Sequence, residues 1–413
     1  MASNPADFYR GQPDRHGVPK LLTRGFAAFA LLNVFIFLGF DVLLPTLTLW
    51  LESHGHSRDA IGRIFSFFML AAIVMRMVAP RLAARFRPFT LMRLGLAVSA
   101  LSSAGYFLAR SAPAASLARF GHGLGFGLTS TILTALAAQI IPPSKMGQGM
   151  GLLGLGAILT LSLGPSLGLW LKDTLGFLPL FLTVSGIYLG GLLWTLTMPD
   201  LTLAGQPAAG QPKPPRLTLL SRLVWAPSLM MALTGVSISA VTVYLALFFN
   251  ELQKPWSGLF FGLSAIGVVI SRLFAGRLHD RCGHQLVIPP ALACMLGTMI
   301  LLINLAGPAT LTAAAVLWGL SVGAAFPSVQ AVTFTSAPPD RRAEASSSLF
   351  NAFDLGLGGG SIVFGLLSEL FQTYRAAFYG ASANCLLFLG FYAFHYLRPW
   401  AAKRRKTAQA ARD

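Results

Sequence analysis

Charge is scarce in this chain of 413 residues, where Asp, Glu, Lys and Arg together make up only 11%. A soluble domain carries about a quarter of its residues in this class. Hydrophobic residues account for 54%, and the mean hydropathy is +0.66. This composition excludes an ordinary soluble globular protein and indicates a polytopic membrane protein.

Cysteines are few, and no signature of a metal or nucleotide site is present. Cys282, Cys294 and Cys385 show no CxxC spacing, so we expect neither a disulfide framework nor a metal cluster. No Walker-type loop, H-E-x-x-H or G-x-S-x-G motif occurs. His54 and His56 lack a carboxylate or cysteine partner, and an exposed loop is their expected setting. We therefore expect no enzymatic activity, no bound metal and no cofactor.

Long apolar runs fill most of the chain. A helix crosses the hydrocarbon core with about 20 apolar residues, so the polar breaks predict twelve transmembrane helices. The segment 199–222, rich in Pro, Gly, Gln and Ala, is predicted to be a flexible linker between two sets of six. The predicted helices are 24–51, 59–78, 89–110, 114–141, 147–171, 177–197, 223–250, 256–276, 285–305, 309–337, 344–371 and 375–397.

The predicted organisation is an all-α membrane protein of two six-helix bundles. The apolar stretch after the polar N-terminus is too long for the core of a signal peptide, so we interpret the N-terminus as an uncleaved cytoplasmic tail. The predicted parts are the tail 1–23, the bundle 24–198, the linker 199–222, the bundle 223–397 and a basic cytoplasmic tail 398–413.

Basic residues outnumber acidic ones by 31 to 14. In a soluble protein this excess suggests a nucleic-acid partner. Here 24 of the 31 Lys and Arg residues fall in the predicted cytoplasmic tails and loops or, for Arg76 and Arg272, at the cytoplasmic ends of helices. We therefore predict an inner membrane protein of a bacterium with both termini in the cytoplasm, and no nucleic-acid partner.

The two halves are related by an internal repeat. An offset of 196 residues aligns Arg76 with Arg272, and Gly123 with Gly319, without a gap. The same offset aligns Gly164 with Gly360. One offset that holds across four predicted helices indicates two parallel repeats, which are typical of secondary transporters.

Four sequence motifs occur in this chain, one at the predicted loop after the eighth helix and three within the predicted fourth, fifth and eleventh helices. The segment 276–283 reads Gly-Arg-Leu-His-Asp-Arg-Cys-Gly and resembles the G-x-L-x-D-R-x-G loop signature of the major facilitator superfamily. The segment 119–127 resembles the fourth-helix motif of that superfamily, and 351–356 resembles a helix-11 pattern of small bacterial exporters of drugs and sugars. Gly164, Pro165 and Gly168 resemble the fifth-helix G-P-x-x-G motif of its proton-coupled exporters. The loop residues that carry the likeness are Gly276, Arg277, Asp280, Arg281 and Gly283.

The resemblance implies a fold and a mechanism, and the sequence departs from the family pattern at two positions. It implies the two-bundle superfamily fold, with substrate bound between the halves, alternating access, and a monomeric working unit. The loop 276–283 would latch one half against the other, or would merely fix the topology. The first-half copy of this loop has Ala84 opposite Asp280, and Leu169 stands where the export motif usually has a second glycine.

Asp41 and Arg119 are the predicted proton-coupling residues. An ionisable side chain near the bilayer centre costs about 2.5–3.5 kcal/mol and so normally pairs or faces a cavity. Asp41 lies about 25 Å along the first helix, and Arg119 lies in the outer half of the fourth. We expect the two to pair, with His122 one turn away as a proton relay. A permanent structural ion pair and a packing histidine are the alternatives.

Four polar residues of the second half are predicted to line the substrate cavity. Asp354 lies about 15 Å into the eleventh helix, with Asn351 one turn before it. Each could bind substrate or a second proton, or could fasten neighbouring helices together. Gln330 and Asn384 are further candidates for the cavity.

The sequence thus predicts proton antiport that exports a small amphipathic molecule. The expected partners are that molecule, protons and the lipid bilayer. A proton-coupled importer would need the same fold and charges. A membrane sensor or scaffold that no longer transports is a third alternative, suggested by the altered first loop.

Overall fold

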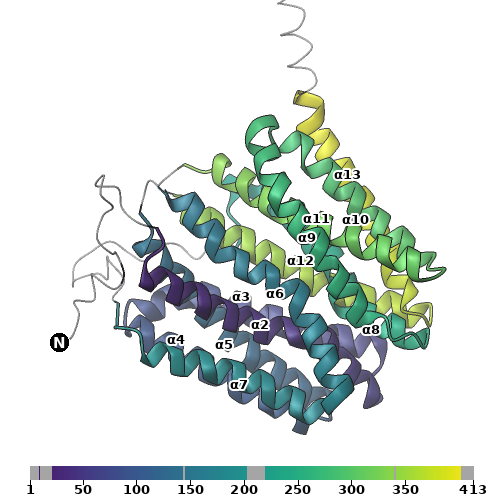
Figure 1. Ribbon diagram of the computed structural model, residues 1–413, viewed down its shortest axis with the longest axis horizontal. Coiled ribbons are helices and arrows are strands. Elements are labelled where there is room, and N and C mark those ends of the chain that lie inside the picture. The colour runs from purple at the N-terminus through teal and green to yellow at the C-terminus, as the bar shows by residue number, and fades with distance from the viewer. Residues whose placement is uncertain (1–8, 10–20, 143–144, 202–218, 339–340, 401–413) are drawn as a thin grey trace, which may run out of the picture. The chain divides into compact units, whose positions relative to one another are not determined.

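The structure is a computed structural model that describes residues 9, 21–142, 145–201, 219–338 and 341–400 (Figure 1). Within these residues the chain forms twelve long α-helices, α2 to α13, and no strand. The predicted all-α membrane fold is therefore confirmed. Eleven stretches are long and apolar enough to cross a membrane, and α9 adds the shorter apolar segment Ser257–Arg272.

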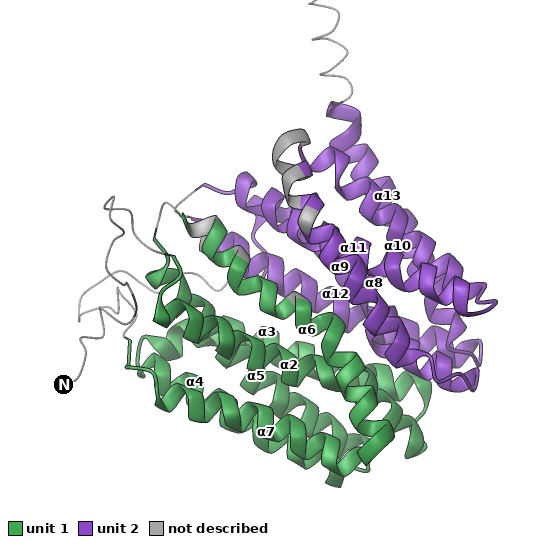
Figure 2. Ribbon diagram, in the orientation of Figure 1, with its two compact units in different colours: residues 1–218 green, residues 219–413 purple. Residues whose placement is uncertain are grey.

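The chain divides into two compact units, Met1–Thr218 and Leu219–Asp413 (Figure 2). The division falls in the predicted linker, of which residues 202–218 lie outside the described part, as does 401–413 of the predicted C-terminal tail. Unit 1 holds α2 (Arg24–Ser53), α3 (Arg58–Ala83), α4 (Pro88–Gly105), α5 (Ala112–Ile140), α6 (Met146–Leu175) and α7 (Phe177–Leu196). Unit 2 holds α8 (Trp225–Glu251), α9 (Ser257–Cys282), α10 (Ile288–Ile303), α11 (Pro308–Ser336), α12 (Arg342–Leu370) and α13 (Arg375–Tyr392).

The motif 276–283 is helical over most of its length, which corrects the predicted loop. Helix α9 continues through Cys282 and ends at Gly283, whose φ of 78° favours glycine. The prediction ended this helix at residue 276 because it took the first charged residues as the end of the helix, whereas they mark only the end of the apolar stretch. The side chains of Arg277, Asp280 and Arg281 lie outside the described part of the structure, so the latch remains a prediction.

Both units use the same helix pairings, as the repeat predicts. In unit 1, α2 packs on α6 and α7, α3 on α5, and α4 on α5 and α7. In unit 2, α8 packs on α12 and α13, α9 on α11, and α10 on α11 and α13. Helices α5 and α11 are both 29 residues long and begin at Ala112 and Pro308, which the offset of 196 relates. The repeat in sequence is therefore a repeat in packing.

Glycines, which have no side chain, allow the helix pairs α3–α5 and α9–α11 to pack with their backbones in contact. A Cβ atom added to Gly123 of α5 would lie 2.3 Å from the carbonyl oxygen of Phe68 on α3. At the equivalent position of unit 2, a Cβ on Gly319 would lie 2.0 Å from the carbonyl oxygen of Ser264. Small residues serve this purpose in membrane proteins, where helices gain little from the hydrophobic effect by associating.

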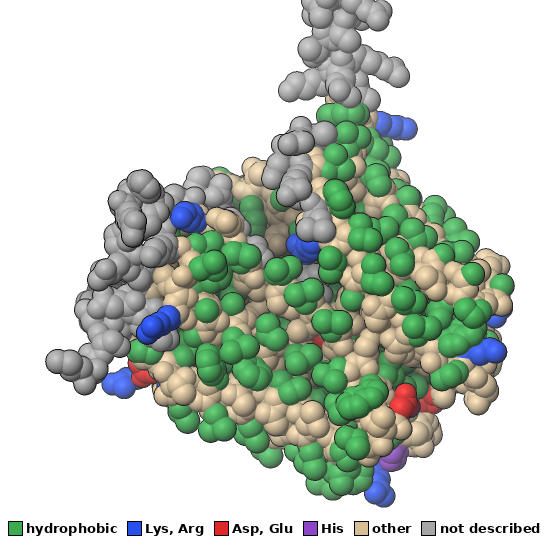
Figure 3. All heavy atoms as spheres, viewed as in Figure 1, with side chains coloured by type: hydrophobic (Ala, Val, Ile, Leu, Met, Phe, Trp, Pro, Cys, Tyr) green, Lys and Arg blue, Asp and Glu red, His purple; other side chains and the backbone are tan. Residues whose placement is uncertain are grey.

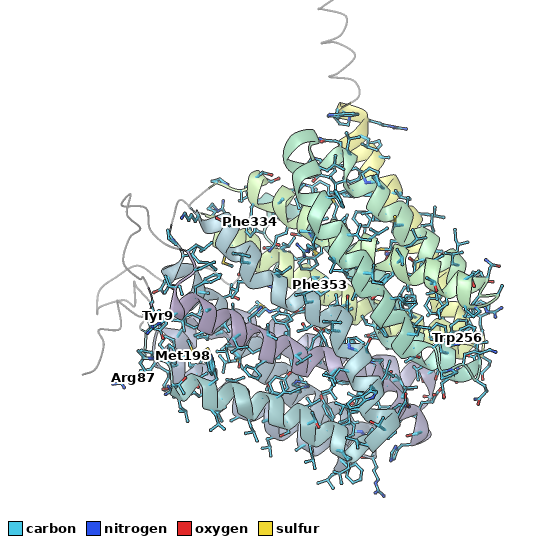
Figure 4. The ribbon with its side chains drawn as sticks, in the orientation of Figure 1. Tyr9, Arg87, Met198, Trp256, Phe334 and Phe353 are labelled. Atoms are coloured by element: carbon cyan, nitrogen blue, oxygen red, sulfur yellow. The ribbon has the colours of Figure 1, made fainter. Side chains whose placement is uncertain are left out.

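Tyr9 of the N-terminal segment packs on the end of unit 1, beside Met198 (Figure 4). Its ring stacks on Phe29 with centroids 5.7 Å apart, and its hydroxyl donates to the carbonyl oxygen of Pro199. Thr23 donates to the carbonyl oxygen of Tyr9 at 2.8 Å. These contacts join the start of the chain to the segment that follows α7.

Hydrophobic side chains are spread over the face seen in Figure 3 and few charged side chains lie among them, as expected of a surface in contact with lipid. The exposed apolar side chains of the protein include Leu101, Leu108 and Leu193, each more than half exposed. The polar residues of interest lie inside the units.

We predict that Gly319→Ala destabilises the protein by about 1–3 kcal/mol, because the new methyl group meets backbone atoms of α9 that cannot turn away. Thermal unfolding of the purified protein in detergent measures the effect. Gly154→Ala is the matched control, since a Cβ there has nothing within 4 Å. Equal unfolding temperatures for the two variants would contradict the close approach.

Candidate functional site

Asp41 lies inside unit 1 and is only 2% exposed. It faces α6, which packs directly against it at Gly164: a Cβ atom there would lie 2.8 Å from Cβ of Asp41. One turn later, a Cβ on Gly168 would lie 2.4 Å from the carbonyl oxygen of Val42. The two glycines of the G-P-x-x-G motif therefore seat α6 on the part of α2 that carries the acid.

A proline stands in each helix close to this crossing. Proline has no N–H group, so it removes the hydrogen bond to the carbonyl group four residues earlier. Pro45 in α2 thereby releases the backbone carbonyl of Asp41, and Pro165 in α6 releases that of Leu161. The helical backbone is weakened on both sides of the place where α2 and α6 touch.

The carboxyl group of Asp41 has few polar neighbours. Thr160 of α6, one turn before Gly164, is its polar neighbour, although the hydroxyl group of Thr160 donates to the carbonyl oxygen of Ala157. Oxygen Oδ2 of Asp41 has no hydrogen-bond partner among the residues that the structure describes. A buried carboxyl group in this state has unused bonding capacity, which is unusual unless it serves a function.

Arg119 of α5 is fully buried and surrounded by aromatic rings. Its guanidinium carbon lies 4.6 Å from the ring centroid of Phe68, 4.7 Å from Phe65 and 5.9 Å from Phe40, which are cation–π distances. The hydroxyl group of Tyr106 is its polar neighbour, but none of its three side-chain nitrogens makes a hydrogen bond in the described part of the chain. Nor does any ion pair among the described residues join it to Asp41. The predicted pair is therefore not formed in this structure.

His122 lies between two tyrosine hydroxyl groups. Its Nδ1 is 3.0 Å from the hydroxyl oxygen of Tyr106, and its Nε2 is 2.8 Å from that of Tyr188. Tyr188 in turn donates to the carbonyl oxygen of Ile36 on α2 at 3.3 Å. Because the Tyr188 hydroxyl hydrogen goes to Ile36, Tyr188 accepts from Nε2–H of His122 and the Tyr106 hydroxyl group donates to Nδ1, which satisfies a neutral imidazole protonated on Nε2. His122 thus has the partners of a hydrogen-bonded packing residue as well as those of a relay.

In unit 2, the predicted cavity residues hold segments together. Asn351 donates from Nδ2 to the carbonyl oxygen of Leu219 at 3.1 Å. Asn384 donates to the carbonyl oxygen of Leu233 and to Oγ of Ser237, both at 2.8 Å. These bonds match the fastening role that the sequence left open for Asn351.

Asp354 and Gln330 differ in their burial. Asp354 of α12 is buried within unit 2, and Gln330 of α11 is half-buried. The structure does not bring either residue together with Asn384 in any described hydrogen bond. Their place in a substrate cavity remains a prediction.

The repeat reveals an asymmetry between the two units. The offset of 196 residues gives each residue of unit 1 an equivalent in unit 2. The equivalents of Asp41, Arg119 and His122 are uncharged, and the equivalents of Pro45 and Pro165 are not prolines. The equivalent pairs are Asp41 and Ser237, Arg119 and Ala315, His122 and Trp318, Tyr188 and Asn384, Pro45 and Val241, and Pro165 and Ser361. The acid, the guanidinium and both weakened helices are thus features of unit 1.

A family model described as Major Facilitator Superfamily matches residues 29–359 and 257–412. The chain belongs to the major facilitator superfamily. The resemblance stated from the motifs is thereby confirmed, and the chain is a multi-pass membrane transporter.

Curated and solved members of the superfamily agree with this assignment. An uncharacterised transporter of Salmonella typhimurium is 29% identical over 284 residues, which are 65% of this chain and 66% of that protein. The multidrug resistance protein MdtG of Citrobacter koseri is 25% identical over 390 residues, 90% of this chain and 93% of that one. The crystal structure of a mutant of the nucleoside transporter NupG matches with a TM-score of 0.73 at 14% identity, over 90% of this chain and 99% of that chain. The last likeness shows the fold alone.

Sequence reasoning missed three residues of this superfamily member's polar interior. Tyr106, Thr160 and Tyr188 are isolated hydroxyl residues in apolar helices, and nothing in their spacing points to His122 or Asp41. The offset of 196 could have drawn attention to Tyr188, because its counterpart Asn384 is also polar in an apolar helix.

We predict that Tyr188→Phe destabilises the transporter by about 1–3 kcal/mol, because it removes a hydrogen-bond partner from the buried His122. The unfolding temperature in detergent is the readout. Tyr379→Phe, at an exposed position on α13, is the control and should leave stability unchanged. If both variants unfold like the native protein, the Tyr106–His122–Tyr188 chain does not contribute to stability.

Proposed function

We propose that this protein is a proton-driven exporter, which moves a small amphipathic molecule outward in exchange for protons by alternating access. It would act in the inner membrane of a bacterium with both termini in the cytoplasm, as its distribution of basic residues favours. The carrier of the proton would be Asp41.

The observation that carries the proposal is the setting of Asp41. This carboxyl group is buried in a membrane-spanning bundle, and its Oδ2 has no hydrogen-bond partner among the described residues. An ionisable group in such a place is expensive, and it is a functional-site hypothesis by default. The glycines that press against it belong to the motif associated with proton-coupled export, which links the acid to the helix crossing.

Arg119 is the proposed alternating partner of Asp41. A guanidinium group stabilises an ionised carboxylate, whereas a separated carboxyl group in an apolar interior is better accommodated with its proton. Neither side chain has an ionic partner among the described residues. We propose that the separated arrangement corresponds to the proton-loaded state, and that the pair forms when the proton leaves.

The nature of the neighbouring side chains supports an amphipathic substrate. Phe40, Phe68 and Phe126 pack together with ring centroids 4.6 to 5.2 Å apart, next to the guanidinium group of Arg119. Such an interior suits aromatic and apolar molecules with few polar groups. The name of the relative MdtG, a multidrug resistance protein, supports export of this class of molecule.

We predict that Asp41→Asn abolishes proton-driven export. A bacterial host that lacks its own efflux pumps would express the native chain or a variant and be loaded with ethidium, tetraphenylphosphonium, chloramphenicol and fluorescein in turn. The native chain should speed the loss of at least one compound, and an uncoupler or Asp41→Asn should reduce that loss at least tenfold.

Asp173→Asn is the matched control, because Asp173 pairs with the adjacent Lys172 and its side chain is 61% exposed. It should export like the native chain. If Asp41→Asn exports as well as the native chain, Asp41 is not the carrier, and Asp354 becomes the residue to test. Accumulation of a compound by native cells would reverse the direction and support an importer.

A further inference from the structure

Thr160 is the polar residue of α6 that neighbours Asp41 at the contact of α6 with α2. It is on α6, 5% exposed, and one turn before Gly164, whose missing side chain brings α6 into contact with Asp41. Its hydroxyl group, however, donates to the carbonyl oxygen of Ala157 at 2.9 Å. The hydroxyl group therefore bonds within its own helix, while Asp41 lies across the contact of α6 with α2.

A threonine hydroxyl group has one hydrogen to donate and two lone pairs with which to accept. It cannot donate to Ala157 and to Asp41 at the same time. With its hydrogen on Ala157, it can still accept a hydrogen bond from a protonated Asp41. With an ionised Asp41, the hydroxyl group would have to turn and donate to the carboxylate. The two protonation states of Asp41 thus call for two orientations of the Thr160 hydroxyl group.

We propose that Thr160 is a positioning residue that sets the pH at which Asp41 takes up and releases its proton. The inference rests on the proposed function, in which Asp41 carries the proton. The hydroxyl group donates to Asp41 in the ionised state and returns to Ala157 when Asp41 is protonated. The orientation found in this structure fits the protonated state, as does the missing partner of Oδ2 in the described residues.

Other charged or titratable groups lie in the interior of unit 1 and could also affect the titration of Asp41. These are Arg119 and His122 of α5, Tyr188 of α7, and Tyr106, which follows α4. The charged pairs Asp59–Arg63 and Lys172–Asp173 lie near the ends of α3 and α6. Thr160 differs from these groups because it lies on α6, the helix that contacts Asp41 directly at Gly164.

The test is a titration of the purified full-length protein, with the proton itself as the probe. Infrared difference spectra follow the C=O stretch of protonated carboxyl groups from acidic to alkaline pH, and the spectra of Asp41→Asn identify the contribution of Asp41. In Thr160→Val the midpoint for Asp41 should move to higher pH by about one unit. The reason is that the bond lost to the ionised form is charge-assisted and about twice as strong as the neutral bond lost to the protonated form.

Thr160→Ser restores the hydroxyl group and should return the midpoint to the native value. Thr234→Val is the matched control: Thr234 is buried in unit 2 and donates within its helix to the carbonyl oxygen of Met230 at 2.9 Å. It should not move the midpoint. Thr160→Ala serves as a second variant if Thr160→Val does not yield folded protein.

Each outcome decides between the proposals. A native midpoint in both Thr160→Val and Thr160→Ala would show that Thr160 only fills space, and would leave the role of Asp41 intact. A band for Asp41 that does not titrate at all in the native protein would instead overturn the proposed proton carrier, and with it the role of Thr160. An equal shift in Thr234→Val would mean that the shift is not specific to the neighbour of Asp41.

Discussion

The contact of α2 with α6 at Asp41 and Gly164 is the constraint on which the rest of the account depends. A glycine at this point brings the backbone of one helix against the acid of the other, and the acid is thereby buried within a lipid-facing bundle. Prolines on both sides release carbonyl groups at the same level. A change in the charge of Asp41 would act where the two helices touch most closely and are least stiffened by their own hydrogen bonds.

The two units share one packing scheme but differ in chemistry. The same helix pairs recur, and Gly123 and Gly319 make equivalent close contacts, so the repeat supplies a common framework. Within that framework, unit 1 keeps an acid, a guanidinium group and an imidazole where unit 2 has Ser237, Ala315 and Trp318. The asparagines of unit 2 fasten helices and an adjoining segment to one another. The proposed proton coupling therefore rests on residues of unit 1, while unit 2 contributes Asp354 as a separate buried acid.

Much of the fold followed from the sequence, because the bilayer sets the length of each apolar run and the side on which basic loops lie, and the 196-residue repeat relates the two halves. The helix ends followed less well: α9 continues to Cys282, since charged residues that leave the membrane can remain helical. The site was predicted in part. Burial of Asp41, Arg119 and His122 follows from their place in apolar helices, whereas the aromatic surroundings of Arg119 and the tyrosine partners of His122 depend on rotations that no spacing specifies.

The central claim is that Asp41 takes up and releases the proton, and its place at the contact of α2 with α6 means that this change of charge should alter the packing of the two helices. Hydrogen–deuterium exchange of the purified protein, corrected for the intrinsic effect of pH, measures this on peptides that cover Asp41 and Gly164. The account predicts that exchange in these peptides differs between acidic and alkaline solution in the native protein, and is the same at both in Asp41→Asn. An identical response to pH in the native protein and in Asp41→Asn would contradict it.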